Sequence, residues 1–137
     1  MNRQDICALL DRNGITPTPQ RVEIALIMLA VHQHMSADQV LDRVNQQGPA
    51  VSKATVYNTL GLFAAKGLLR QVIVDPARIF YDSNPAPHHH FFNVDDGSLI
   101  DFSVDECLIG RLPALPEGTS AEGVDVIVRI RNDRKAA

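Results

Sequence analysis

A short segment with two prolines limits how this chain can fold. Pro85 and Pro87 stand in the stretch Asn84-Pro85-Ala86-Pro87. Proline fixes one backbone torsion and lacks the amide hydrogen, so this segment is a stiff linker that no helix or central strand can cross. With 137 residues, the chain has room for two small domains. We therefore expect domains at residues 1–83 and 88–137, joined by a hinge at residues 84–87.

The composition is that of a folded protein outside the membrane. Hydrophobic residues make up 45% of the chain, and charges of both signs are present, which excludes a disordered polypeptide. No apolar run approaches the ~20 residues that a membrane helix needs. The first residues also lack the layout of a signal peptide. We expect a cytoplasmic protein with no membrane partner.

The net charge of −3 is unevenly distributed. Residues 1–82 carry eight Lys and Arg against seven Asp and Glu, whereas residues 83–137 carry five against nine. The acidity therefore belongs to the second part. If the first part binds nucleic acid, the attraction must come from a local patch of positive charge.

Four helices and a hairpin are expected in the first domain. Apolar residues at helical spacing, with capping residues before them, predict helices over residues 2–13, 19–31, 37–46 and 53–66. Thr18, Ser36 and Ser52 are the expected N-caps, and Gly14 is an expected stop. Two short strands, residues 68–75 and 78–82, follow with a turn between them. Helices followed by a β-hairpin form a winged helix, whose last helix enters the major groove of DNA.

The second domain is expected to be small and mixed. Residues 90–94 and 99–102 are predicted as strands around the turn Asp95-Asp96-Gly97, and residues 103–110 as one or two helical turns. Residues 124–131 alternate in polarity and predict a further strand. At about 50 residues this part buries too little surface to be stable alone, so we expect a homodimer. The fold class is α+β, with a winged-helix domain and a small α/β dimerisation domain.

The two cysteines carry little chemistry. Cys7 and Cys107 lie far apart, and neither belongs to a Cys-x-x-Cys pair. A structural zinc site made of four cysteines is therefore impossible within one chain. We expect both residues to be small apolar side chains in packed positions.

The helix after Ser52 is the expected DNA reader. Its polar side chains offer hydroxyl, amide and ammonium groups, which suit phosphate oxygens and base edges. The alternative is a capped surface helix whose polar side is only solvated; the hairpin directly after it favours DNA. The candidate DNA-binding residues are Arg21, Ser52, Lys53, Thr55, Tyr57, Asn58 and Thr59.

Three consecutive histidines follow the hinge. In an extended segment, alternate residues share a side, so His88 and His90 are expected to face together. Neutral imidazoles together with carboxylates suit Fe²⁺, Mn²⁺ or Zn²⁺. The alternative is that the histidines form an exposed polar turn.

Four motifs in register resemble the ferric uptake regulator family, over most of the chain. They are Thr18-Pro19-Gln20-Arg21-Val22, His34-Met35-Ser36-Ala37-Asp38, Ala54-Thr55-Val56-Tyr57-Asn58-Thr59-Leu60, and Tyr81-Asp82 followed by His88-His89-His90. The resemblance implies a dimeric winged-helix repressor or activator. It also implies a C-terminal dimerisation domain and a metal site between the domains that sets the DNA-binding geometry.

The resemblance also implies a ligand set. The family's metal site corresponds to His34, Asp82, His88, His90 and Asp101. Aspartate at 82 and 101, where glutamate is usual, shortens the reach by one methylene. The Cys-x-x-Cys that holds structural zinc in many members is replaced by Asn93-Val94-Asp95-Asp96. The family's other regulatory site loses its ligands at Pro87 and Leu108.

Part of the pattern is similar to the iron response regulator branch of that family. The triple histidine followed by Phe91-Phe92, and the closing segments Leu-Pro-Ala-Leu-Pro-Glu-Gly and Val-Asp-Val-Ile-Val-Arg-Ile, carry this similarity. It implies a response to haem. Imidazole is a normal axial ligand of haem iron, and Phe80, Phe91 and Phe92 are expected to flank a porphyrin. The candidate haem residues are His88, His89 and His90; the Cys-Pro haem motif is absent.

The expected function is regulation of iron or haem homeostasis. A metal-loaded dimer would bind an A/T-rich inverted repeat in double-stranded DNA. Two dimers could also bind together on the DNA. Haem would compete with the metal for His88–His90 and release the DNA. A zinc- or manganese-responsive regulator is an alternative within the family. Outside it stand a metallo-hydrolase, for which no general base is evident, and a metal or haem trafficking protein. We expect no enzyme.

Overall fold

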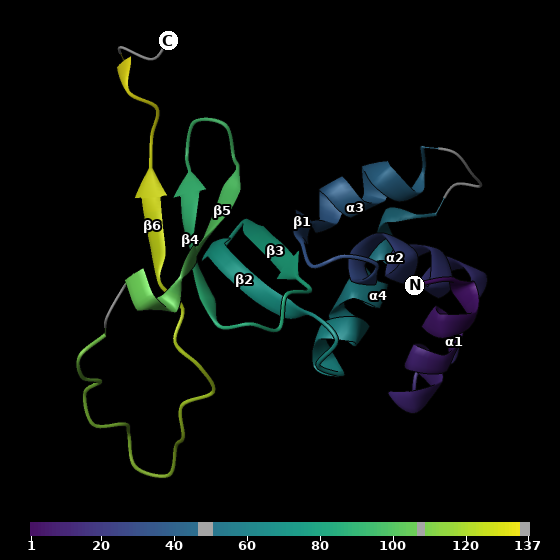
Figure 1. The fold of residues 1–137 in the computed structure, drawn as a ribbon, viewed down its shortest axis with the longest axis horizontal. Coiled ribbons are helices and arrows are strands. Elements are labelled where there is room, and N and C mark those ends of the chain that lie inside the picture. The colour runs from purple at the N-terminus through teal and green to yellow at the C-terminus, as the bar shows by residue number, and fades with distance from the viewer. Residues whose placement is uncertain (47–50, 107–108, 135–137) are drawn as a thin grey trace. The chain divides into compact units, whose positions relative to one another are not determined.

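The computed structural model of the 137-residue chain describes residues 1–46, 51–106 and 109–134 (Figure 1). The chain divides into two compact units, Met1–Pro85 and Ala86–Ala137. The break falls inside the proline-bearing segment. Within the described ranges, no helix is long and apolar enough to cross a membrane. Each unit has its own three-stranded sheet.

The first unit begins with two capped helices. Helix α1 (Arg3–Arg12) opens with a capping box in which Asn2 and Asp5 each accept the other's backbone amide. It stops before Gly14, whose φ of +71° suits glycine. Helix α2 (Pro19–Leu29) has Thr18 as its N-cap and Pro19 at its first position. These expected caps and the expected stop are confirmed.

Two further helices complete the bundle. Helix α3 (Ala37–Val44) has the expected capping box between Ser36 and Gln39. It ends earlier than expected, because Asn45 caps it and makes two hydrogen bonds with the backbone of Val51. Gln47-Gly48-Pro49, the segment expected to end this helix, lies outside the described residues. Helix α4 (Lys53–Ala65) has Ser52 as its N-cap, as expected.

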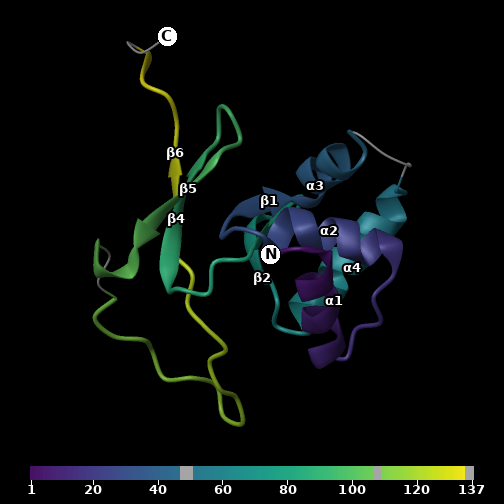
Figure 2. The ribbon, with the colours of Figure 1, turned by 45° about the vertical axis from the view of Figure 1, so that its right-hand side comes forward.

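A three-stranded antiparallel sheet follows in the order β1-β3-β2. Strands β2 (Arg70–Asp75) and β3 (Arg78–Asp82) form the expected hairpin, closed where the Asp75 carboxylate accepts the amide of Ala77. Strand β1 (His34–Ser36) was not expected, since its three residues carry no alternation of their own and its partner is 46 residues away in register. Helices and hairpin together form a winged helix, visible in Figures 1 and 2.

The helices and the hairpin share one hydrophobic core. Its largest fully buried side chains include Ile6, Leu10, Ile24, Met28, Leu60 and Phe63. Cys7 is half-buried and packs against this core, as expected of a small apolar side chain. Cys107 lies outside the described residues. This shared core fixes α4 against the other helices.

The second unit is a three-stranded sheet in the order β5-β4-β6. Strand β4 (His88–Asn93) begins two residues earlier than expected, so all three histidines lie in it, and β5 (Leu99–Ser103) runs antiparallel to it. Strand β6 (Ile127–Ile130) is shorter than expected and runs parallel to β4. A single 3₁₀ turn, η1 (Val104–Glu106), follows β5. Residues 109–126 form a long exposed connection, the wide loop of Figure 1.

Candidate metal centre

Two histidines and one aspartate converge on one face of the second unit's sheet. His88 and His90 are alternate residues of β4, and Asp101 of β5 lies opposite His90. Oδ1 of Asp101 is 3.3 Å from Nε2 of His90 and 3.9 Å from Nε2 of His88. The two imidazole centroids are 4.6 Å apart. The expectation that His88 and His90 face the same way is confirmed.

These separations suit a shared cation. Imidazole nitrogen and carboxylate oxygen bind Zn²⁺ at about 2.0–2.2 Å, so ligand atoms around one ion lie roughly 3–4 Å apart. Both histidines are buried, with His90 at 0% exposure, while Asp101 is 41% exposed at its side chain. Nitrogen and oxygen donors of this kind fit Fe²⁺, Mn²⁺ or Zn²⁺.

A second contact orients His88. Its Nδ1 lies 2.6 Å from the carbonyl oxygen of Ala86. Because a carbonyl only accepts, Nδ1 donates this hydrogen bond, and in the neutral imidazole Nε2 then presents its lone pair. Metal-binding histidines generally donate their other ring N–H to a carbonyl or carboxylate in this way. The tautomer of His88 is therefore the one that a cation on the Asp101 side requires.

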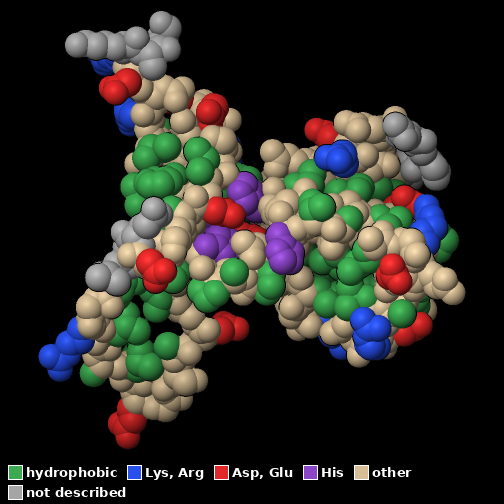
Figure 3. Space-filling model, in the orientation of Figure 1, with side chains coloured by type: hydrophobic (Ala, Val, Ile, Leu, Met, Phe, Trp, Pro, Cys, Tyr) green, Lys and Arg blue, Asp and Glu red, His purple; other side chains and the backbone are tan. Residues whose placement is uncertain are grey.

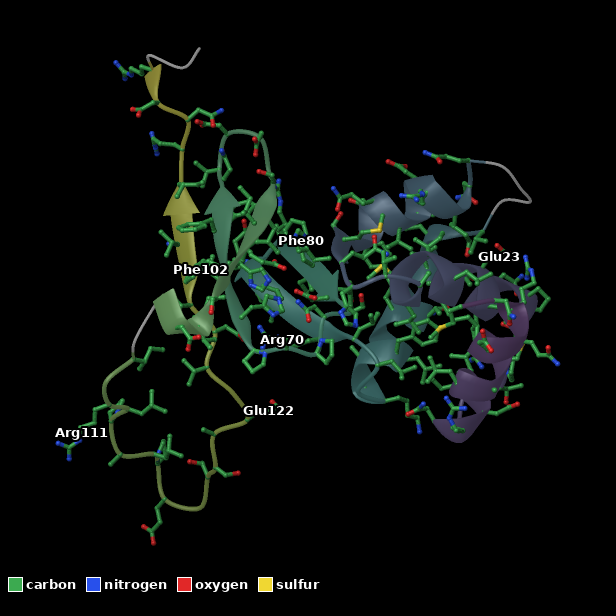
Figure 4. All side chains as sticks on the ribbon, viewed as in Figure 1. Glu23, Arg70, Phe80, Phe102, Arg111 and Glu122 are labelled. Carbon is green, nitrogen blue, oxygen red and sulfur yellow. The ribbon has the colours of Figure 1, made fainter. Side chains whose placement is uncertain are left out.

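His89 belongs to the opposite face of the same sheet. Its Nδ1 accepts a 3.1 Å hydrogen bond from the backbone amide of Val126, and its ring lies 5.6 Å from the ring of Phe102 (labelled in Figure 4). Phe91 shares this side and lies 4.7 Å from Phe102. The expectation that His89 and Phe91 join His88 and His90 around one haem is therefore wrong in geometry, since strand alternation separates them.

His34 and Asp82 form a second group, in the first unit. They are directly opposite each other in the antiparallel pair of β1 and β3, so both side chains leave the same face. Asp82 is 2% exposed, and its Oδ1 accepts the amide of Asn84 at 2.8 Å. The His34 ring stands edge-on to Phe80 at 6.2 Å. The predicted ligand set thus falls into a pair in one unit and a trio in the other.

The expected DNA-binding residues differ in how far their side chains are exposed. Ser52, Lys53, Tyr57 and Asn58 of the α4 region are exposed, whereas Thr55 is half-buried and its hydroxyl accepts from Ser52 at 2.9 Å. Thr59 is 4% exposed, so the expectation that its hydroxyl lies on the exposed face is wrong. The sequence itself indicates this burial. Thr59 follows Val56 by three residues and precedes Phe63 by four, so it lies on the same apolar face of the helix as these two side chains. Arg21 is half-buried and donates to the Thr16 carbonyl at 2.9 Å.

Three polar residues near these sites were missed by sequence reasoning. Asn84 positions the Asp82 carboxylate. The Ser83 hydroxyl binds the backbone of residues 31–33. Asp38 accepts the hydroxyl of Tyr57 at 2.9 Å. For Asp38, the capping motif was the only signal in the sequence. No signal in the sequence marked Ser83 or Asn84. Ser83 contacts backbone groups about 50 residues away, and Asn84 contacts Asp82 through its backbone amide.

Comparison with known proteins places these sites in context. The family model described as the ferric uptake regulator family matches residues 12–115. The peroxide-responsive repressor PerR of Staphylococcus saprophyticus is 29% identical over 99 residues, which is 72% of this chain and 67% of that protein. The ferric uptake regulator of Pseudomonas aeruginosa with manganese matches with a TM-score of 0.67 and 25% identity, covering 93% of this chain and 97% of the other. The Vibrio cholerae ferric uptake regulator, at 20% identity and a TM-score of 0.71 with coverages of 92% and 98%, shows the same fold.

Proposed function

Because the chain belongs to the ferric uptake regulator family, we propose that it is a metal-responsive transcriptional regulator acting on double-stranded DNA in the cytoplasm. The observation that carries the proposal is the convergence of His88 and His90 on the Asp101 carboxylate. This trio has the donor types, the spacing and the His88 tautomer that a divalent cation needs. The winged helix of the first unit supports a regulator and not an enzyme.

The proposed ligand set is His88, His90 and Asp101, completed by His34 and Asp82. When bound, a divalent cation would supply the positive charge that these imidazole and carboxylate groups would hold in one arrangement. Because the proposed ligands come from both units, occupancy would bias the orientation of the reading helix, which is the coupling that regulation requires. Fe²⁺, Mn²⁺ and Zn²⁺ are all compatible with this donor set.

DNA is proposed to be read by α4. The N-terminal part of this helix presents the Ser52 hydroxyl, the Lys53 ammonium and the Asn58 amide to solvent. Arg21, Thr55 and Tyr57 are proposed to add contacts. Ammonium and hydroxyl groups suit phosphate oxygens, and an amide suits adenine. An A/T-rich inverted repeat, with one α4 in each half-site, is the proposed target.

A second copy of the chain is proposed to cover the other face of the second unit's sheet. Ile100, Phe91 and Val128 form one row across β5, β4 and β6. Ile100 is 49% and Val128 39% exposed, and Figure 3 shows hydrophobic side chains gathered over this unit. A unit of this size gains stability by burying such a row. The same strand β4 would then carry metal ligands on one face and the dimer contact on the other. Pairing of dimers on DNA is a further step of the same proposal.

We further propose that the regulator responds to haem, as the similarity to the iron response regulator branch implies. Its support is the pair of buried imidazoles at His88 and His90, since imidazole binds haem iron. Haem would take these ligands from the cation and release DNA. A zinc- or manganese-responsive regulator would use the same site without haem.

Fluorescence anisotropy of labelled duplexes tests the proposal. The protein is titrated, with and without Mn²⁺, against a duplex selected from a random pool and against a scrambled duplex of the same composition. Mn²⁺-dependent preference for the selected duplex, lost in His88→Ala/His90→Ala and kept in the exposed-residue control His32→Ala, supports the regulator. Release by haemin would favour the haem-responsive version. Metal or haem binding without any duplex preference would overturn the proposal and favour a trafficking protein.

A further inference from the structure

One side chain of α3 holds a side chain of the reading helix. The Tyr57 hydroxyl donates a 2.9 Å hydrogen bond to Oδ1 of Asp38. Tyr57 is 40% exposed on α4, and Asp38 is exposed in the first turn of α3. Nζ of Lys53 lies 5.5 Å from the centre of the Tyr57 ring, one helical turn earlier on the same face. The ring is therefore held at its hydroxyl end and accompanied by a cation, beside the groups proposed to read DNA.

The needs of the fold do not account for this contact. The N-terminus of α3 is already capped by Ser36 and Gln39, and an exposed hydrogen bond of this kind adds little stability. A carboxylate beside a DNA-reading helix also repels phosphate, so it lowers affinity for any duplex. A residue that weakens binding to all DNA is useful there only if it improves the choice among sequences.

The contact also determines what Tyr57 can offer. Since the hydroxyl proton is donated to Asp38, it is not available to a base or phosphate acceptor. Tyr57 then presents its ring, which makes apolar contact with base edges. A tyrosine has two rotatable side-chain bonds, and the hydrogen bond to Asp38 restricts them at the exposed end, so the position of the ring depends on Asp38.

We propose that Asp38 is a specificity-determining positioning residue, which holds the Tyr57 ring toward the bases and opposes phosphate contacts that leave the bases out of reach. This inference rests on the proposed DNA-reading function of α4. It assigns to an acidic residue of α3, outside the reading helix, a role in selecting the sequence that α4 binds.

The proposal predicts opposite effects on two duplexes. Asp38→Ala removes both the hydrogen bond and the charge. Binding to the selected duplex should weaken by about threefold and binding to the scrambled duplex should strengthen by about twofold, in line with exposed electrostatic contacts. A merely structural role would weaken both. Asp42→Ala is the matched control, because Asp42 is an exposed aspartate one turn further along α3 and the Tyr57 hydroxyl donates to Asp38 instead.

A double-mutant cycle separates position from charge. Tyr57→Phe removes the hydroxyl alone, so it should reduce the preference for the selected duplex. Adding Asp38→Ala should then remove only the effect of the charge, so the double variant should lose less preference than the sum of the two single losses. Asp38→Asn keeps the shape and an oxygen acceptor but removes the charge, so it should strengthen binding to the scrambled duplex by about twofold and change binding to the selected duplex less. Absorbance titration supplies a spectroscopic readout: hydrogen bonding to Asp38 raises the pKa of Tyr57, and Asp38→Ala should lower it toward the ordinary tyrosine value.

The experiment uses the full-length Mn²⁺-loaded protein with the selected and scrambled duplexes. Loss of preference in Asp38→Ala, retention in Asp42→Ala and non-additivity with Tyr57→Phe support the inference. Equal effects of the two aspartate variants, or additive effects of Asp38→Ala and Tyr57→Phe, overturn it while leaving the proposed function intact. If the parent protein itself shows no preference, the proposed function fails and this inference fails with it.

Discussion

His34 on β1 lies directly opposite Asp82 on β3. The next step of the same ladder joins Gln33 to Ser83, where the Ser83 amide donates to the Gln33 carbonyl at 2.9 Å. The Ser83 hydroxyl accepts the Gln33 amide at 3.0 Å and donates to the Val31 carbonyl at 3.0 Å. One hydroxyl thus fixes the connection that leads from α2 into the proposed ligand His34.

Replacing Ser83 by alanine should therefore lower the free energy of unfolding by about 1–2 kcal/mol, because the half-buried backbone amide of Gln33 loses its acceptor. Urea denaturation followed by circular dichroism measures this change. Ser120→Ala, in the exposed connection 109–126, should have no measurable effect. An equal effect of the two variants would show that the Ser83 contacts contribute nothing.

The two faces of β4 predict different consequences for neighbouring histidines. His90→Ala should weaken Mn²⁺ binding by more than about tenfold, as loss of a ligand does. His89→Ala should change Mn²⁺ affinity by less than about twofold but lower the free energy of unfolding by about 1 kcal/mol, since Val126 loses its acceptor. Isothermal titration calorimetry and urea denaturation distinguish the two. Comparable loss of Mn²⁺ affinity in His89→Ala would contradict the assignment of faces.

Hydrogen bonds between side chains and backbone close one end of the second unit's sheet. The Asn93 amide donates to the Asn132 side chain at 2.8 Å, and the Asn132 backbone amide donates to Asp95 at 2.7 Å. Treatment with EDTA should therefore leave the far-ultraviolet circular dichroism spectrum unchanged at 25 °C. Unfolding on EDTA treatment would show that a structural metal is required after all.

Asn132→Ala should lower the free energy of unfolding by about 1 kcal/mol through loss of the bond to Asn93. The neighbouring exposed variant Arg131→Ala should change it by less than about 0.5 kcal/mol. Differential scanning calorimetry on the metal-free protein gives both values. A larger effect of Arg131→Ala would mean that this network does not hold the end of the sheet.

Substitution by alanine should change the free energy of unfolding in opposite directions at two glycines. A Cβ at Gly61 of α4 would meet no atom within 4 Å, so Gly61→Ala should raise the free energy of unfolding by about 0.5–1 kcal/mol. Gly14 has a φ of +71°, and Gly14→Ala should lower it by about 1–2 kcal/mol. Thermal denaturation of the two variants compares them. Destabilisation by Gly61→Ala would indicate that α4 is more tightly packed there than the structure shows.

The hydrogen bond between Tyr57 of α4 and Asp38 of α3 should depend on pH. Hydrogen bonding to Asp38 raises the pKa of Tyr57 above its value in the unfolded chain. The contact is therefore fully present below the ordinary tyrosine pKa of about 10 and is lost as the pH rises through the higher folded-state value. Absorbance titration of the parent protein against Tyr57→Phe, which leaves Tyr81 as the remaining tyrosine, should show this late ionisation. Ionisation of Tyr57 at or below the ordinary value would show that the bond to Asp38 is absent in solution.

Much of the fold was predictable because its signals are local. Caps at Thr18, Ser36 and Ser52, and the turn after Asp75, each depend on residues within a few positions. Strand β1 was not predictable in this way, since three residues become a strand only through pairing with β3. The start of β4 at His88 was missed because Pro87 suggested a longer break.

The candidate site was predictable in part for the same reason. Strand alternation alone placed His88 and His90 on one side. Strand alternation also predicts that His89 lies on the other face. This consequence was missed because the three adjacent histidines were counted as one group. Asp38 was missed because its role depends on a tyrosine 19 residues later, and such a pair becomes visible only once α3 and α4 are packed.

Reciprocal binding of metal and DNA tests the central claim most directly. The dissociation constant for Mn²⁺ is measured by titration calorimetry on the parent protein and on His90→Ala, each with and without a saturating selected duplex. If metal and DNA are coupled, the duplex must tighten Mn²⁺ binding by the same factor by which Mn²⁺ tightens duplex binding. We expect equal factors above one in the parent protein and no coupling in His90→Ala. An Mn²⁺ affinity that the duplex leaves unchanged in the parent protein would contradict a coupling between the metal site and DNA.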